Sequence, residues 1–92
     1  MKMLRRRQDS TQKSEKDGIA EAKEKAGDIG QSDWENIQDP ETGGIIGRRS
    51  PDGKQEWRVD RKRHPEYDEP PHVNWKNWKK GKKEGGYGHV YY

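Results

Sequence analysis

The chain has 92 residues, of which 40% are charged and only 24% are hydrophobic, and its formal net charge is +3. This length allows one domain at most, and the scarcity of apolar residues lies close to the composition of disordered proteins. The absence of cysteine excludes disulfides, thiolate zinc sites and cysteine nucleophiles.

The sequence has the pattern of neither a transmembrane segment nor a complete signal peptide. The longest apolar run is Val90 to Tyr92, so no transmembrane segment is predicted. Residues 1–7 resemble the basic start of a signal peptide, but no apolar stretch follows them. We therefore expect either that an export signal is encoded elsewhere or that the chain is a piece of a longer protein.

The positive charge is concentrated in the second half of the chain. Residues 1–39 hold 8 basic and 9 acidic side chains, whereas residues 40–92 hold 12 and 8. Between residues 76 and 92, five lysines are accompanied by a single acid, Glu84. This distribution favours an anionic polymer as ligand, and a solvated surface is the alternative.

The first 39 residues are predicted to be a disordered lead-in over 1–13 and a weakly helical segment over 14–39. A helix is expected over 14–26, because Ser14 can cap its start, Glu21 and Lys25 can pair, and Gly27 can end it.

A second short helix is expected within 28–40. Ser32 and Glu35 have the spacing of a capping box, Trp34 and Ile37 would share a face, and Asp39 precedes a proline that ends the helix.

Strands are predicted from residue 40 onward, where alternating segments are separated by turn residues. Ser50-Pro51-Asp52-Gly53 is a strong turn signal and predicts a hairpin. The four expected strands are 44–48, 55–60, 72–75 (or 72–78) and 87–92, with a proline-bounded loop at 61–71 and a basic loop at 79–86. The expected fold class is α+β, with one or two short N-terminal helices and a small antiparallel sheet of about four strands over 40–92.

Three of these segments divide their side chains between two faces, because successive residues of a strand point in opposite directions. The apolar face would carry Trp57, Val59, Val73, Trp75, Val90 and Tyr92. The opposite face would carry Arg58, Asp60, His72, Asn74, His89 and Tyr91. We expect the helices to cover the apolar face and the polar face to be open.

The polar face has the residue types that cleave RNA without metal. His72 and His89 are the candidate general acid and base, because histidine transfers protons near neutral pH. Arg58 would stabilise the charge that develops on the phosphate, and Asp60 would hold a histidine tautomer or act as a base itself. The alternative for each histidine is a solvated or structural imidazole.

Further residues are candidates for substrate binding. Asn74 would orient a histidine or a base, and Tyr91 would position a phosphate. Lys82 and Lys83 would donate to phosphate from the basic loop, and Trp78 would stack on a base.

A metal site is the rival chemistry, with candidate ligands His64, His72, His89, Asp60 and Asp68. Their spacings match no tight ligand pair such as H-x-x-x-H. We therefore predict that the chain uses no metal or other cofactor.

The runs W-R-V-D, P-P-H-V-N-W and G-K-K-E-G-G-Y-G-H-V-Y-Y together resemble the C-terminal toxin domains of bacterial polymorphic toxins, which end contact-dependent inhibition, Rhs and LXG proteins. The resemblance covers roughly residues 40–92 and extends to the barnase-like ribonuclease layout, although the predicted sheet is smaller and the helices are poorer. It implies that His72, His89 and Arg58 are at catalytic positions.

The resemblance also implies a biological setting. The chain would be secreted as part of a larger bacterial effector, would act on RNA such as tRNA in the target-cell cytoplasm, and would be blocked by a cognate immunity protein. The sequence thus predicts a metal-independent ribonuclease toxin domain. The alternatives are a non-enzymatic basic module that binds nucleic acid and a metal-dependent DNase that uses a His/Asp cluster.

Overall fold

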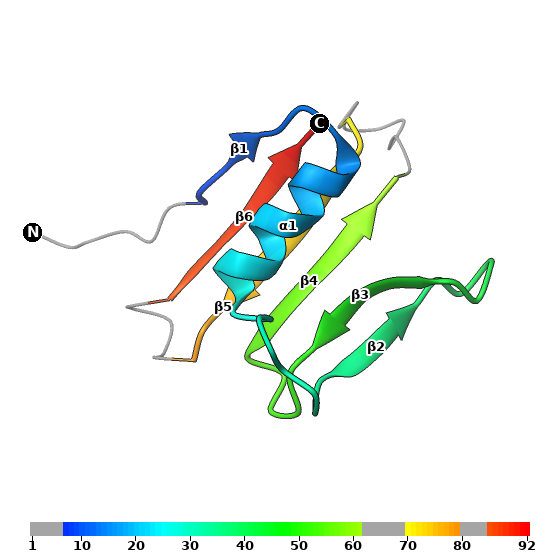
Figure 1. Cartoon of the computed structure of the whole chain (residues 1–92), viewed down its shortest axis with the longest axis vertical. Coiled ribbons are helices and arrows are strands. Elements are labelled where there is room, and N and C mark those ends of the chain that lie inside the picture. Colours follow the sequence, from blue (N-terminus) through cyan, green and yellow to red (C-terminus); the bar gives the residue numbers. More distant parts are fainter. Residues whose placement is uncertain (1–6, 62–69, 80–84) are drawn as a thin grey trace, which may run out of the picture.

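A computed structural model describes residues 7–61, 70–79 and 85–92. In these residues one helix, α1 (Glu15–Ala26), lies across one face of a mixed, mostly antiparallel sheet (Figure 1). The six strands described, in chain order, are β1 (Ser10–Thr11), β2 (Glu35–Gln38), β3 (Ile45–Arg49), β4 (Gln55–Asp60), β5 (His72–Asn77) and β6 (Gly86–Tyr91). Their order across the sheet is β1-β6-β5-β4-β3-β2. The predicted α+β class is confirmed: the described residues form one helix, within the predicted one or two, and six strands where about four were predicted.

The helix has the boundaries that its capping residues predict. The Ser14 hydroxyl accepts a hydrogen bond from the main-chain N–H of Asp17 at 3.2 Å. Gly27 has a φ of 90°, a left-handed conformation that glycine adopts without strain, and its N–H donates to carbonyls of the last turn. Lys25 Nζ pairs with Glu21 Oε2 at 3.1 Å, as expected for residues four apart. With 12 residues, this helix is too short and too polar to cross a membrane, and it is the one helix of the described residues.

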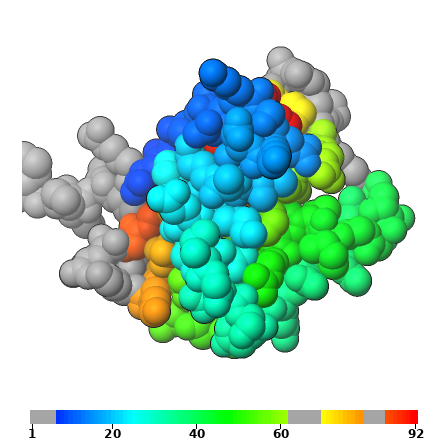
Figure 2. Space-filling model, viewed as in Figure 1, coloured from blue at the N-terminus to red at the C-terminus, as the bar shows by residue number. Residues whose placement is uncertain are grey.

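The core lies between α1 and the three central strands, and Figure 2 shows the helix covering the middle of this side of the molecule. The buried apolar side chains are Ala22, Ala26, Trp34, Trp57, Val59, Val73, Trp75 and Val90, with Ile19 and Tyr92 packed against them. The predicted apolar face is therefore confirmed. At Gly18 the helix lies close to the sheet, because a Cβ there would be in van der Waals contact with the ring of Tyr92 at 3.4 Å and with Val73 at 3.5 Å.

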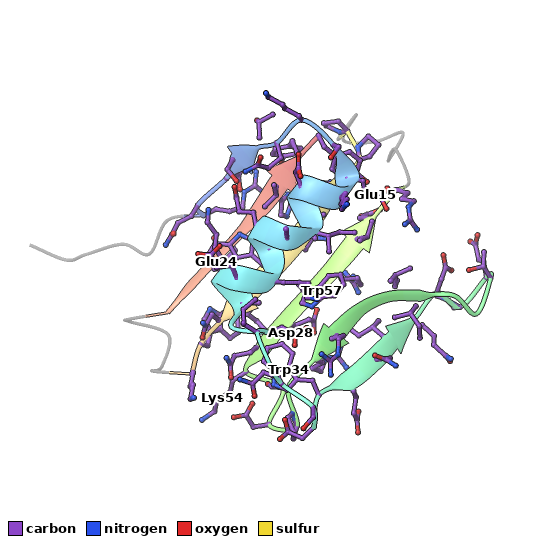
Figure 3. The ribbon with its side chains drawn as sticks, in the orientation of Figure 1. Glu15, Glu24, Asp28, Trp34, Lys54 and Trp57 are labelled. Carbon is purple, nitrogen blue, oxygen red and sulfur yellow. The ribbon has the colours of Figure 1, made fainter. Side chains whose placement is uncertain are left out.

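The predicted second helix is wrong, because part of its segment forms β2, which pairs antiparallel with β3. The Asp28 carboxylate is buried and accepts hydrogen bonds from Arg48 Nη1 at 2.9 Å and Trp57 Nε1 at 2.7 Å. Figure 3 shows Asp28 beside Trp57, with Trp34 nearby. These contacts bring the chain after α1 alongside β3. As a strand paired with β3, this segment forms more main-chain hydrogen bonds than it would as one isolated helical turn. Nucleation of such a turn is also unfavourable.

The predicted disordered lead-in is also wrong over the described residues 7–13. Strand β1 pairs parallel with β6, placing Ser10 beside Val90. Main-chain N–H groups on either side extend this pairing, from Gln8 to the Tyr87 carbonyl at 2.8 Å and from Gln12 to the Tyr91 carbonyl at 2.7 Å. Residues 1–6 lie outside the described part of the chain.

Two glycines on the helix side of β6 make room for its neighbours. A Cβ on Gly86 would lie 3.1 Å from the Trp75 indole, and a Cβ on Gly88 would overlap the carbonyl oxygen of Gln8. The glycine-rich sequence before His89 therefore lets an indole and the N-terminal strand pack directly on β6.

Candidate active site on the open face of the sheet

The face of the sheet opposite α1 carries polar side chains in rows that run across β4, β5 and β6. One row is Asp60, His72 and Tyr91, the next is Arg58, Asn74 and His89, and the third is Glu56, Lys76 and Tyr87. The six polar residues predicted to share a face do so. Among the residues the structure describes, the one helix lies on the other side of the sheet.

His72 and His89 stack against each other on this face, across β5 and β6. Their ring centroids are 4.2 Å apart and the ring planes differ by 14°. The Tyr91 ring lies 5.5 Å from the His72 ring and 5.9 Å from the His89 ring, so three aromatic rings from β5 and β6 form one cluster. Two of the chain's three histidines are thus held side by side.

His72 is nearly enclosed, with 4% of its surface exposed. Its Nδ1 lies 2.8 Å from the carbonyl oxygen of Pro70, and because a carbonyl can only accept, Nδ1 carries a proton. The sequence predicts Asp60 for the role of holding a tautomer. Asp60 Oδ2 lies 3.9 Å from the other ring nitrogen, Nε2, which is within ion-pair distance when the ring is protonated, and the role of Asp60 in holding a tautomer stays a prediction.

His89 is half-buried and has contacts from two directions. Its Nδ1 lies 3.2 Å from the Tyr91 hydroxyl, and its main-chain N–H donates to Asp9 Oδ1 at 3.0 Å. Sequence reasoning misses Asp9, because the contact spans 80 residues and no local pattern signals it.

Arg58 is exposed and lies across Asn74 from His89. Neighbouring strands are about 4.8 Å apart, so the Cα atoms of Arg58 and His89 are separated by roughly 10 Å. A guanidinium on a side chain of this length can reach the space above Asn74. The row therefore places a cation, an amide and an imidazole around one patch of surface.

Trp78 follows β5 and belongs to the far end of the same face. Its main-chain N–H donates to the Lys54 carbonyl at 2.8 Å, and Lys76 Nζ lies 4.9 Å from the centroid of its ring. Trp78 is six positions after His72, which corresponds to about 20 Å along an extended strand. Sequence reasoning misses Lys76 as a site candidate. The alternation that places His72 and Asn74 on one face also places Lys76 there, two residues after Asn74.

Ion pairing at the end of β4 joins this strand to the helix on the other side of the sheet. Arg61 forms an ion pair with Glu15, and the hydrogen bond from Arg61 lowers the pKa of that carboxyl. Burial and the Glu15 carboxylate raise the pKa of Tyr92, whose hydroxyl donates to Glu15 at 3.2 Å. The start of α1 is thereby joined to the ends of β4 and β6.

Some predicted site residues fall outside the part of the chain that the structure describes, namely Lys82, Lys83, His64 and Asp68. Within the described part, no group of three or more histidine and acidic side chains is arranged to hold a metal ion.

No protein-family model matches the chain. No curated protein matches it either. The resemblance to polymorphic-toxin domains therefore stays a prediction.

Proposed function

We propose that the chain is a metal-independent ribonuclease whose substrate lies on the open face of the sheet. The observation that carries the proposal is the stacked pair of His72 and His89 beside the exposed Arg58. A site of this kind needs two proton-transfer groups and a cation within reach of one phosphodiester, and these residue types meet here.

The reaction would be an internal transesterification. The 2′-oxygen of a ribose forms a bond to phosphorus while the bond from phosphorus to the 5′-oxygen breaks. One imidazole takes the proton of the 2′-hydroxyl, and the other gives a proton to the leaving 5′-oxygen. The half-buried His89 would be one of these two groups, and Nε2 of His72, the ring nitrogen on the side of Asp60 that does not contact Pro70, would be the other.

The remaining residues of the face would bind and position the RNA. Arg58 would stabilise the non-bridging phosphate oxygens, and Asn74 would orient the substrate between Arg58 and His89. Tyr91 would act through its contact with His89. Trp78, with Lys76 above its ring, would provide a stacking platform for a base farther along the strand.

The biological setting is proposed from the sequence resemblance. The chain would be the C-terminal toxin domain of a secreted bacterial effector, with RNA such as tRNA as its target in the cytoplasm of a competing cell. A cognate immunity protein would cover the open face. Lys82 and Lys83 would add phosphate contacts.

The test is cleavage of total RNA and of plasmid DNA by the purified chain, each with EDTA and with magnesium. We expect RNA fragments with 2′,3′-cyclic phosphate ends in EDTA. His89→Ala and His72→Ala should each lower the rate at least about 100-fold, the scale of general acid–base catalysis. His64→Ala is the matched control, and full activity in both variants of the pair would refute the proposal.

The binding module is the second candidate, favoured by the contact of Lys76 with Trp78. It predicts a salt-sensitive shift of RNA on a gel without strand scission. Cutting of DNA only when magnesium is present would instead support the metal-dependent DNase.

A further inference from the structure

Strands β3 and β4 separate partway along their length. Their pairing runs from Arg49 beside Glu56 to Gly47 beside Arg58, and Val59 and Asp60 continue beyond it. At Gly47 the two backbones are so close that a Cβ would overlap the Trp57 carbonyl oxygen. Past this point the hairpin of β2 and β3 turns away from the end of β4 (Figure 1).

A hollow of about 240 Å³ occupies the resulting space, which we call the wedge pocket. Pro40, Ile46 and Val59 give it apolar walls, and Asp39, Arg58 and Arg61 supply polar groups. Asp39 is held in the hairpin turn, where its carboxylate accepts the Glu41 N–H at 2.8 Å and its own N–H donates to the Gly44 carbonyl at 2.8 Å. Hydrogen bonds to main-chain groups of the turn therefore fix the position of Asp39, one of the polar groups of the pocket.

We infer that the wedge pocket binds one nucleobase of the RNA substrate. The inference rests on the proposed function, because it assigns a base subsite to the proposed ribonuclease. Pockets for drug-sized ligands are about 300–1,000 Å³, so a smaller hollow suits a single heterocyclic ring.

The chemistry of the walls matches a base better than a phosphate. A base has apolar faces and an edge of donors and acceptors, and the pocket offers aliphatic carbons together with carboxylate and guanidinium groups. The charges also balance: Arg58 and Arg61 are accompanied by Asp39 and Asp60, and Arg61 already pairs with Glu15. A dedicated phosphate site would have an excess of cations.

Arg58 connects the pocket to the candidate active site. It lines the wedge pocket and also stands in the row with Asn74 and His89. A nucleotide whose base occupies the pocket would bring its phosphate toward Arg58. The pocket would therefore select the base next to the bond that is cut.

The experiment is an NMR titration of the full chain carrying His89→Ala, with the 3′-monophosphates of adenosine, guanosine, cytidine and uridine as probes. We expect saturable shifts of the Ile46 and Val59 methyl resonances with at least one nucleotide. Ile46→Phe, which fills the pocket, should weaken that binding by about tenfold or more, equivalent to ~1.4 kcal/mol. Ile45→Phe is the matched control, since Ile45 is the preceding residue of β3 and is 53% exposed.

The outcomes separate this inference from the proposed function. Absence of methyl shifts with all four nucleotides, or equal shifts with inorganic phosphate alone, would overturn the base subsite. RNA cleavage by the unmodified chain would then still support the ribonuclease. Binding in the pocket without any cleavage of RNA would support the subsite and leave the catalytic proposal refuted.

Discussion

His72 and His89 stack with ring centroids 4.2 Å apart, although the register pairs His72 with Tyr91 and His89 with Asn74. The two histidines are diagonal neighbours on β5 and β6, a separation that aromatic side chains can bridge. Their surroundings differ, because His72 is 4% exposed and contacts the Pro70 carbonyl, while His89 is half-buried. This difference leads to the first prediction.

Replacing the two histidines should affect stability unequally. His72→Ala leaves a cavity and an unpaired Pro70 carbonyl and should lower the free energy of unfolding by about 1–3 kcal/mol. His89→Ala removes a half-buried ring and should cost about 1 kcal/mol or less. Urea unfolding measures both values, and equal losses would contradict the asymmetry of the pair.

The stack itself can be checked by proton NMR. Each ring lies in the shielding region of the other, so His89→Ala should shift the ring-proton resonances of His72. Tyr91→Phe is the control, because it keeps the neighbouring aromatic ring and removes only the hydroxyl. Unchanged His72 resonances in His89→Ala would show that the rings are not stacked in solution.

The polar face could be predicted from the sequence because its strands alternate with a strict period of two. In β4 and β5 the apolar residues are few and stand at alternate positions, namely Trp57, Val59, Val73 and Trp75. Because these residues must face the core, the residues between them must face the other side of the sheet. The register then follows from matching the apolar residues across strands. Helix α1 was equally predictable, since Ser14 and Gly27 are local signals.

The features that could not be predicted from the sequence depend on contacts between residues far apart in the chain. The capping pattern of Ser32 and Glu35 is local, but contacts of Asp28 with Arg48 and Trp57 place this segment next to β3 instead. Strand β1 has no apolar alternation and pairs through its main chain. The contact of His72 Nδ1 with the Pro70 carbonyl likewise depends on the path of the backbone before β5.

Asp28 should be essential for stability, because its buried carboxylate bonds both Arg48 and Trp57. Asp28→Ala leaves Arg48 without its ion-pair partner and should lower the free energy of unfolding by about 3 kcal/mol or more. Asp33→Ala, at an exposed position of the same connection, is the matched control. A urea midpoint in Asp28→Ala that equals that of the control would show that this ion pair does not hold β2 and β3 in place.

Gly88 should be required for strand β1 to dock. A Cβ at this position would overlap the Gln8 carbonyl, so Gly88→Ala should detach β1 from β6 while the helix and the central strands stay folded. Amide hydrogen exchange reports this directly, because the N–H groups of Gln8 and Gln12 bond to β6. Gly44→Ala is the control, since a Cβ there meets only Thr42 Oγ1 at 3.4 Å. Protection of both glutamine amides in Gly88→Ala would contradict the docking geometry.

The attachment of β1 to α1 should weaken in acid because of Glu21. Partial burial raises the pKa of Glu21, but hydrogen bonds from Ser10 and Gln12 together with Lys25 outweigh it, and the net pKa lies below the ordinary value of 4.5. A carboxyl whose pKa is lower in the folded state stabilises the fold above its unfolded pKa. That stabilisation is lost as the pH falls through the folded pKa, so it should fade below about pH 4.5.

The measurement compares Glu21→Gln with Glu24→Gln, a substitution at an exposed position on the same helix. In urea unfolding between about pH 7 and about pH 3, Glu21→Gln should show a shallower loss of stability than the unmodified chain, since one carboxyl with a lowered pKa is gone. Glu24→Gln should keep the original slope. Glu15, whose pKa is also lowered, accounts for part of the slope that remains in Glu21→Gln. Identical slopes in the two variants would mean that the bonds from Ser10 and Gln12 to Glu21 do not contribute to the attachment of β1.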